Sequence, residues 1–81
     1  MKKFVIISFD DTDEMWLPER ESTTMDLEIA KSIFEMEKKR IDDKGLQEDW
    51  FVNIFTEDED GKLTDYDWPN WVYPQSRIPK D

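Results

Sequence analysis

Two runs of acidic residues are the part of this sequence whose residue types and spacing could do chemistry. Asp10, Asp11 and Asp13 directly follow an apolar segment, and a second run over residues 57–60 stands just before Gly61. Carboxylates in such runs can hold a divalent cation, act as general acids or bases, or present negative charge to a basic partner. These three uses make different demands on the rest of the chain.

Enzymatic chemistry lacks its usual participants. The 81 residues contain no His and no Cys, so the commonest general base and all thiolate chemistry are missing. The Ser residues therefore have no His or Cys that could activate them as nucleophiles. We expect a protein that is not an enzyme and that needs no cofactor. The absence of Cys also fits a reducing, cytoplasmic compartment.

Neither acidic run has the ligand pattern of a dedicated metal site. The first is similar to the strand-end aspartates of phosphatases, but their Asp-x-Asp-x-Thr motif would place Thr where this sequence has Met15. The second is similar to the middle of a helix–loop–helix calcium loop, which needs Asp at its first position and Glu at its twelfth. Those two positions hold Thr56 and Asp67. Both runs are therefore interpreted as polar turns, and no metal site is predicted.

Charge indicates the kind of partner. The chain has 21 acidic and 11 basic residues, a net charge of −10. The excess is uneven: residues 10–21 hold six acids and one Arg, and residues 47–67 hold eight acids and one Lys. Contacts to phosphates need clustered Lys and Arg, so nucleic acid is not expected as a direct ligand. Trp, Phe, Leu and Tyr are interspersed with the acids, which predicts a folded acidic domain and not a disordered tail.

Residues 4–9 predict the strand around which the fold is organised. Its side chains alternate between faces, and those on both faces are apolar, which is typical of a central strand covered on two sides. Residues 10–13 then form a turn, and residues 14–17 return as a short strand with Pro18 at a sheet edge. The alternative is one long loop over residues 10–23.

A helix is expected next, with Thr23 or Thr24 as its N-cap and Gly45 as the left-handed residue that ends it. Such a glycine would let Leu46 fold back on Ile41. Two neighbouring apolar rows at helical spacing together predict a wide stripe that packs on a sheet. The rows are Met25, Ile29, Ile33 and Met36, and Leu27, Ala30, Phe34 and Ile41.

The remaining residues complete a four-stranded sheet. Residues 50–56 predict another strand that is apolar on both faces, and Asp60-Gly61 predicts a hairpin to a strand over residues 62–68. Trp71 and Tyr73 in the C-terminal tail are expected to cover the sheet face opposite the helix. The predicted fold is α+β, a single small acidic domain over residues 1–81 in which one helix packs on an antiparallel sheet with strand order 2-1-3-4. In this arrangement the two acidic runs lie at opposite ends of the sheet.

These features predict an acidic binding protein that occludes a cationic, nucleic-acid-binding surface of a basic partner protein. In size and composition the chain resembles the small Cys-free inhibitors of phage and mobile elements, DNA mimics that act on restriction, CRISPR or DNA-repair enzymes. The predicted partner-binding residues are carboxylates of the two runs and of the last strand, with two Trp residues as hydrophobic anchors: Asp10, Asp11, Asp13, Glu57, Asp58, Glu59, Asp60, Asp65, Asp67, Trp16 and Trp71.

Two other functions stay open. An immunity or antitoxin protein for a basic nuclease toxin would use the same surface physics. An ordinary cytosolic domain would be acidic for solubility alone and would form a homodimer through its apolar sheet face. None of the three needs a cofactor, and no stretch of the sequence approaches the roughly 20 apolar residues of a membrane span.

Overall fold

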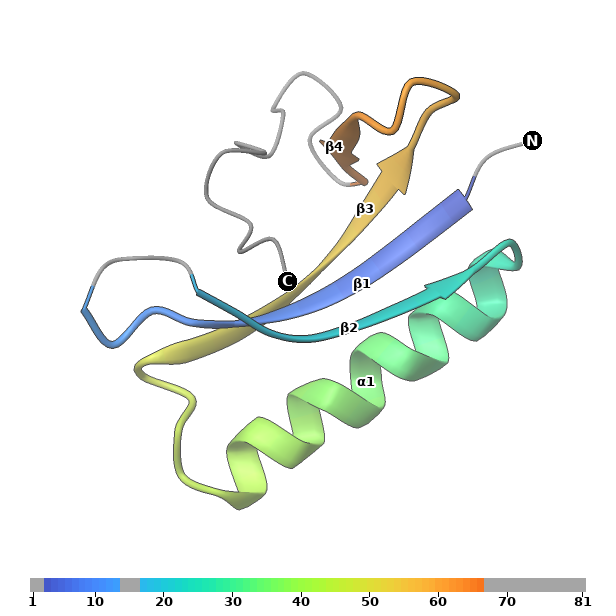
Figure 1. Cartoon of the computed structure of the whole chain (residues 1–81). Helices are drawn as coiled ribbons and strands as arrows, with labels where there is room; N and C mark the ends of the chain where they lie inside the picture. The colour runs from blue at the N-terminus through green and yellow to red at the C-terminus, as the bar shows by residue number, and fades with distance from the viewer. Residues whose placement is uncertain (1–2, 14–16, 67–81) are drawn as a thin grey trace.

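The computed structural model describes residues 3–13 and 17–66 of the chain. The elements in order are β1 (Lys3–Asp10), β2 (Leu17–Thr24), α1 (Leu27–Asp43), β3 (Trp50–Glu57) and β4 (Leu63–Asp65). The strands pair antiparallel in the order β2-β1-β3-β4 (Figure 1). This confirms the predicted α+β fold and its strand order. No helix in the described residues is long and apolar enough to cross a membrane.

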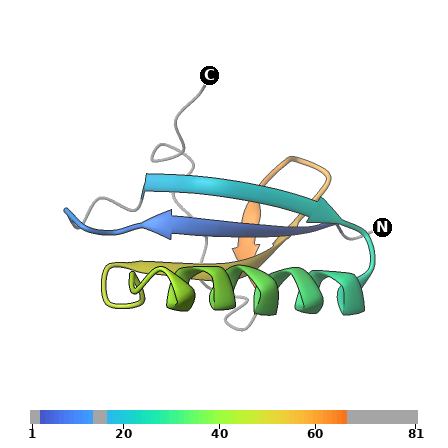
Figure 2. The ribbon, with the colours of Figure 1, turned by 90° about the horizontal axis from the view of Figure 1, so that it is seen from below.

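The central strand β1 is buried on both faces, as predicted. Toward α1, Ile6 packs with Ala30 and Ile54. The opposite face holds a second apolar cluster made of Val5, Ile7, Phe9, Phe55 and Leu63. The side chains of four apolar residues of β1 are at most 1% exposed: Val5, Ile6, Ile7 and Phe9. Helix α1 lies along one of the two faces (Figure 2). The predicted cover of the other face by Trp71 and Tyr73 falls outside the described residues and stays a prediction.

The two predicted apolar rows of the helix pack on the sheet to different extents. In the row of Leu27, Ala30, Phe34 and Ile41, Ala30 and Ile41 are buried and Phe34 packs against the core. Residues of the other row remain exposed: Met25 at 54%, Ile29 at 50% and Met36 at 69%. Ile33 of this second row also packs against the core, so the expected apolar stripe is confirmed at Ile33 and is wrong for Met25, Ile29 and Met36. Ile33 and Met36 lie beside β2, which contributes the polar residues Arg20 and Ser22 to the groove there.

The helix begins later than predicted. Its N-cap is Asp26, whose carboxylate accepts hydrogen bonds from the backbone N–H groups of Glu28 at 2.8 Å and Ile29 at 3.3 Å. The prediction of Thr23 or Thr24 as N-cap is wrong, because both residues belong to β2. An Asp cap also places a negative charge at the positive end of the helix dipole.

The other end of α1 confirms the role predicted for Gly45. Its φ is +70°, and its N–H donates to the carbonyl of Asp42 at 3.0 Å. The N–H of Leu46 donates back to the carbonyl of Ile41 at 3.1 Å. This pair of bonds is a Schellman motif, which satisfies the last carbonyls of the helix and turns the chain toward β3.

The hairpin of β1 with β2 is confirmed, and the single loop over residues 10–23 is wrong. The bounds of the return strand were misplaced: residues 14–16 lie outside the described residues, and the pairing runs from Leu17 to Thr24. Pro18 lies within the strand, at the sheet edge that was predicted for it. An edge strand tolerates a proline, since one side of its backbone has no strand to pair with.

The last described strand is shorter than the predicted strand over residues 62–68. β4 covers Leu63–Asp65, and the N–H of Tyr66 donates to the carbonyl of Ile54 at 2.9 Å. Residues from 67 onward lie outside the described residues.

Candidate partner-binding surface

The loop after β1 is closed by its own polar groups. The carboxylate of Asp10 accepts hydrogen bonds from the hydroxyl and the backbone N–H of Thr12. These bonds, the one from the hydroxyl first, hold the pKa of Asp10 below its ordinary value of 3.8. The N–H of Asp11 donates to the carbonyl of Asp49 at 2.8 Å, and Asp13 is exposed. The first predicted acidic run is therefore an ordered turn, and its Asp10 is ionised at neutral pH.

The antiparallel pairing of β1 with β3 adds two acids that are far away in sequence. Asp10 is the register partner of Trp50, so the loop that leads into β3 lies beside the loop that leaves β1. Glu48 and Asp49 in that loop are exposed. We call this cluster the Asp11 end: Asp10, Asp11, Asp13, Glu48 and Asp49. Glu48 and Asp49 were not among the predicted partner-binding residues, although the predicted antiparallel pairing places the end of one strand beside the start of the other.

An aromatic side chain borders the Asp11 end. Trp50 is partly exposed and lines a shallow cavity of about 190 Å³ between α1 and β3, together with Phe34, Lys38, Ile41, Asp42, Gln47, Phe51 and Val52. The sequence assigned Trp50 to a core strand and placed the aromatic anchors at Trp16 and Trp71. Both of those residues lie outside the described residues. Trp50 is the Trp that the described structure places beside acidic loops.

The second acidic run forms the hairpin between β3 and β4. The carboxylate of Asp58 accepts hydrogen bonds from the N–H groups of Asp60 and Lys62, both at 2.9 Å. Glu57 forms an ion pair with Lys3 at 3.5 Å. We call this cluster the Asp58 end: Glu57, Asp58, Glu59 and Asp60. The last three of these residues are exposed.

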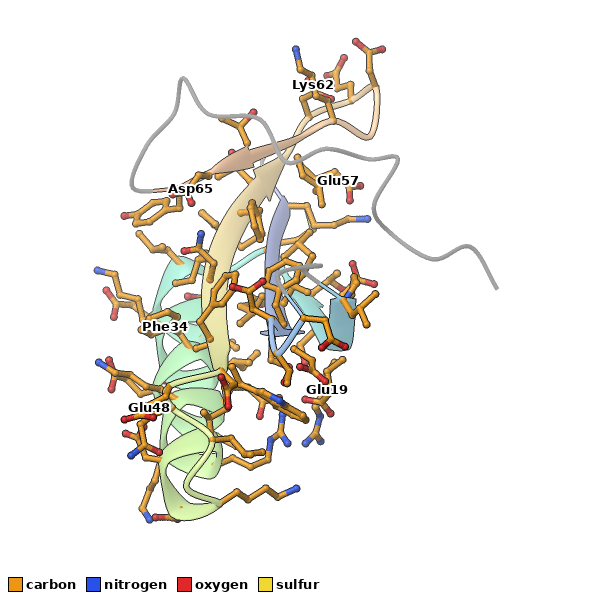
Figure 3. The ribbon with its side chains drawn as sticks, turned by 90° about the vertical axis from the view of Figure 1, so that its left-hand side faces the viewer. Glu19, Phe34, Glu48, Glu57, Lys62 and Asp65 are labelled. Atoms are coloured by element: carbon orange, nitrogen blue, oxygen red, sulfur yellow. The ribbon has the colours of Figure 1, made fainter. Side chains whose placement is uncertain are left out.

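The two clusters lie at opposite ends of the sheet, as predicted. β1 pairs Lys3 with Glu57 at one end and Asp10 with Trp50 at the other, and Figure 3 shows Glu48 and Glu57 toward opposite ends of the molecule. The eight residues of β1 span on the order of 24 Å at the usual rise per residue. This exceeds the screening length of about 10 Å at 0.1 M salt. The two ends therefore act as separate charged surfaces.

Asp65 does not lie on the accessible acidic surface. It is 8% exposed, its register partner is Phe55, and its carboxylate accepts a hydrogen bond from the side-chain amide of Asn53. The register turns it toward the apolar face opposite α1. Asp67, the other carboxylate predicted on this strand, lies outside the described residues.

A network of ionic side chains joins α1 to β2. Arg40 donates to Glu19 at 2.6 Å and to Glu37 at 2.7 Å, and Glu37 also pairs with Arg20 at 3.3 Å. The hydroxyl of Ser8 donates to Glu19 at 3.0 Å. Glu37 is 8% exposed, so this is a partly buried network and not a solvated salt bridge. Its members come from β1, β2 and α1, so no local pattern of the sequence predicts it.

A β-bulge makes this network geometrically feasible. Consecutive side chains of a regular strand point to opposite faces, yet Glu19 and Arg20 both reach residues of α1. The register between β1 and β2 shifts between Ser8 and Phe9: Ser8 lies opposite Arg20, and Phe9 lies opposite Pro18. The extra residue is Glu19, and bulges of this kind re-aim a side chain.

The network lowers the pKa of Glu19. Burial acts in the opposite direction, but hydrogen bonds from Arg40 and Ser8 and the charges of Arg40 and Lys44 outweigh it and hold the pKa of Glu19 below its ordinary value of 4.5. The hydrogen bond from Arg40 to Glu37, followed by the bond from Arg40 to Glu19, raises the pKa of Arg40. Glu19 and Arg40 are therefore both ionised at neutral pH.

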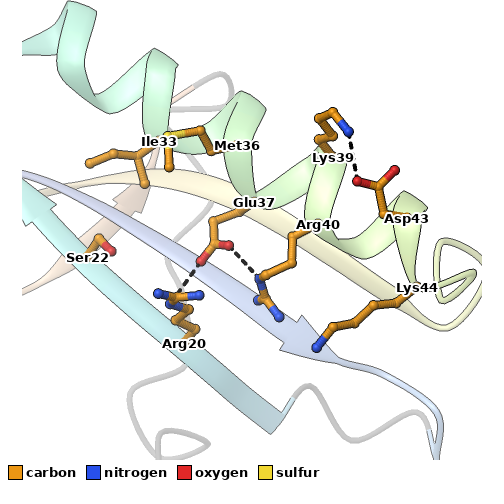
Figure 4. Close-up of a pocket in the computed structure, with 9 residues that line it drawn as sticks. All are labelled: Arg20, Ser22, Ile33, Met36, Glu37, Lys39, Arg40, Asp43 and Lys44. Atoms are coloured by element: carbon orange, nitrogen blue, oxygen red, sulfur yellow. Dashed lines mark hydrogen bonds and ion pairs between the residues drawn. The ribbon is translucent and has the colours of Figure 1, made fainter.

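Beside this network lies a groove of about 510 Å³ between α1 and β2, drawn in Figure 4. Its lining combines basic and apolar side chains with two acids: Arg20, Ser22, Ile33, Met36, Glu37, Lys39, Arg40, Asp43 and Lys44. Four of the chain's 11 basic residues thus gather in one place. The groove therefore carries more basic than acidic side chains, unlike the two acidic ends of the sheet.

Within the described residues, no three acidic side chains converge closely enough to hold a metal ion. Comparisons with protein-family models, with curated proteins and with solved structures find no match for this chain. The function of the two acidic ends is therefore inferred from the residues that form them.

Proposed function

We propose that this chain is an acidic, non-enzymatic binding protein that occludes a cationic, nucleic-acid-binding surface of a partner protein. The observation that carries the proposal is the Asp11 end, where five carboxylates on two joined loops border the partly exposed Trp50. Carboxylates around an aromatic side chain combine electrostatic steering with a hydrophobic anchor, and Trp is enriched at the energetic centres of protein interfaces.

Two features favour the Asp11 end as the principal contact. Residues 10–13 and 47–50 contain five acids and no Lys or Arg, so the local sequence on both sides of this contact is uniformly acidic. The Asp11–Asp49 hydrogen bond and the Asp10–Thr12 bonds also hold the loops in place. Ordered carboxylates lose less conformational entropy on binding than mobile ones, which leaves more of the interaction free energy for affinity.

The Asp58 end is the secondary contact in this proposal. Glu57 is paired with Lys3, and Lys62 closes the same hairpin, so part of its charge is compensated within the chain. Its exposed carboxylates still add to the long-range field that attracts a basic partner. An immunity protein for a basic nuclease toxin would use the same two acidic ends. The identity of the partner, a toxin or another nucleic-acid-binding protein, separates these two functions.

Affinity capture with a matched variant tests the proposal. The wild-type chain and a variant with Asp13→Asn, Glu48→Gln and Asp49→Asn are immobilised and exposed to a lysate of the source organism. A variant with Glu21→Gln, Glu28→Gln and Glu35→Gln serves as the control, because it loses the same charge from exposed positions outside the Asp11 end. We expect a basic protein that wild type and control retain, that the Asp11-end variant loses, and that duplex DNA elutes. Equal retention by all three chains, or retention that DNA does not reverse, would contradict the proposal.

A further inference from the structure

The shallow cavity between α1 and β3 has an apolar wall. Phe34 and Ile41 line it from the helix, and Trp50 and Val52 line it from the strand. Trp50 and Val52 are two residues apart on β3, so their side chains share the face that packs against α1. At roughly 30 Å³ per water molecule in the liquid, the cavity volume of about 190 Å³ has room for one long side chain.

Three carboxylates belong to the lining of this cavity or to the residues next to it. Asp42 lines the cavity directly, and Glu48 and Asp49 stand in the chain between the lining residues 47 and 50. Among the described residues, none of the three carboxylates forms an ion pair with a basic side chain. The cavity also lies beside the last turns of α1, and the C-terminal end of a helix carries partial negative charge. Its surroundings therefore attract a cation.

We propose that this cavity binds an arginine side chain of the basic partner. The inference rests on the proposed function, because it names the group that the Asp11 end holds on the partner. The methylene stem of an arginine packs on the apolar wall formed by Phe34, Ile41 and Val52. Its planar guanidinium stacks on an aromatic ring and pairs with carboxylates, and Trp is the aromatic residue that attracts a cation most strongly.

Two other kinds of side chain fit this site less well. A wholly apolar side chain would remove water from the nearby carboxylates without giving them a partner, which costs free energy. A lysine ammonium is a compact, strongly hydrated charge that lacks the planar group needed for stacking. The combination of an aromatic wall with carboxylates therefore favours arginine over both.

Of the described residues, one base lines the cavity, Lys38. It lies four residues before Asp42 on the same face of α1, so its ammonium competes with an incoming cation for that carboxylate. Lys38 is exposed, and its long side chain can turn toward solvent when the site is occupied. Removal of the Lys38 charge should therefore strengthen arginine binding, whereas removal of the Asp42 charge should weaken it.

A short peptide tests the cavity without the partner. The probe is the capped tripeptide Gly-Arg-Gly, titrated into the labelled full chain and followed by NMR at the indole N–H of Trp50, which Trp50→Phe identifies by its absence. The citrulline analogue keeps the shape of arginine without its charge, and the lysine and norleucine analogues present the two competing chemistries. The arginine peptide should shift the Trp50 signal with saturation and bind about fivefold more tightly than each analogue.

Matched variants of neighbouring residues locate the binding. Asp42→Asn should weaken binding of the arginine peptide about threefold, and Lys38→Gln should strengthen it. Asp43→Asn is the control, because it removes the same charge from the next residue of α1, which is not part of this lining. Its effect on the affinity should be much smaller than that of Asp42→Asn.

Several results would overturn the inference. They are equal binding of the arginine and citrulline peptides, tighter binding of the norleucine peptide, and shifts confined to the acidic loops with the Trp50 signal unchanged. Equal effects of Asp42→Asn and Asp43→Asn would overturn it too.

The peptide titration and the affinity capture can fail independently. A basic partner that the Asp11-end variant loses, together with no preference for the arginine peptide, would refute this inference and leave the proposed function standing. Selective binding of the arginine peptide, without capture of a basic partner, would confirm the cavity as an arginine site and refute the proposed function.

Discussion

The backbone N–H of Asp11 donates a hydrogen bond to the carbonyl of Asp49 at 2.8 Å. This single bond joins the loop that leaves β1 to the loop that enters β3. Acids that are far apart in sequence thereby form one charged end of the sheet beside Trp50. The carboxylates of this end repel one another. Backbone contacts between the two loops hold them together against this repulsion.

Two substitutions at Asp58 should separate the effect of its charge on stability from the effect of its hydrogen bonds. Asp58→Ala removes the acceptor of two backbone N–H groups and should lower the free energy of unfolding by about 1 kcal/mol. Asp58→Asn removes the charge and keeps an acceptor oxygen, so its cost should be smaller. Urea unfolding of both variants measures the difference. Equal losses would show that the side-chain bonds do not stabilise the turn.

The ionic network between α1 and β2 should contribute more to stability than its surface position suggests. Arg40→Met leaves Glu37, which is 8% exposed, without its shortest ion pair, and should lower the free energy of unfolding by about 3 kcal/mol. Lys39→Met removes a solvent-exposed pair with Asp43, and salt and water screen such pairs, so its effect on stability should be much smaller than that of Arg40→Met. Thermal and urea unfolding of the two variants provide the comparison. Similar effects from both would mean that the network is no stronger than an ordinary surface pair.

Glu19 should make stability depend on pH in a predictable direction. Its pKa in the folded chain is lower than its ordinary value of 4.5, so the folded state favours the ionised form. The stabilisation is present above pH 4.5 and is lost as the pH falls through the lower folded pKa. Other carboxylates titrate in the same range, so the comparison is with Glu19→Gln. The difference in stability between wild type and this variant should shrink on acidification; a constant difference would contradict the assignment.

The apolar and turn patterns predicted the fold because they are local. The two-sided apolar strand at residues 4–9 could only be central, and Gly45 marked the end of α1 through its left-handed conformation. The bounds of β2 could not be predicted, because an edge strand needs no apolar face and Pro18 is tolerated there. The N-cap is Asp26 and not the predicted Thr23 or Thr24, because β2 extends to Thr24.

The candidate surface depended on pairings that no local pattern contains. The register that turns Asp65 toward Asn53, and the loop that brings Glu48 and Asp49 beside Asp11, follow from strand alignment. The Arg40–Glu19 pair depends on a one-residue bulge. Local spacing could identify the acids, but it could not tell which of them would be buried, paired or brought together.

Substitution of two aromatic residues in the C-terminal segment tests the predicted cover of the sheet face opposite α1. Trp71→Ala with Tyr73→Ala should lower the free energy of unfolding by several kcal/mol, because each buried aromatic side chain contributes about 1.5–3 kcal/mol. Gln75→Ala is the control from the same segment. Urea unfolding should also show a smaller m-value if apolar surface is already exposed in the folded double variant. Stability equal to that of wild type would show that these two side chains do not cover the sheet.

The most direct test of the central claim is a titration of the captured basic partner with this chain at several salt concentrations, in the presence and absence of duplex DNA. Wild type should bind competitively with the DNA, and its affinity should fall steeply as salt rises. A chain neutralised at both ends, by Asp13→Asn, Glu48→Gln, Asp49→Asn, Glu59→Gln and Asp60→Asn, should fold normally, bind at least tenfold more weakly, and show a shallower salt dependence. Equal affinity of the two chains at low salt, or simultaneous binding of chain and DNA to the partner, would contradict the account.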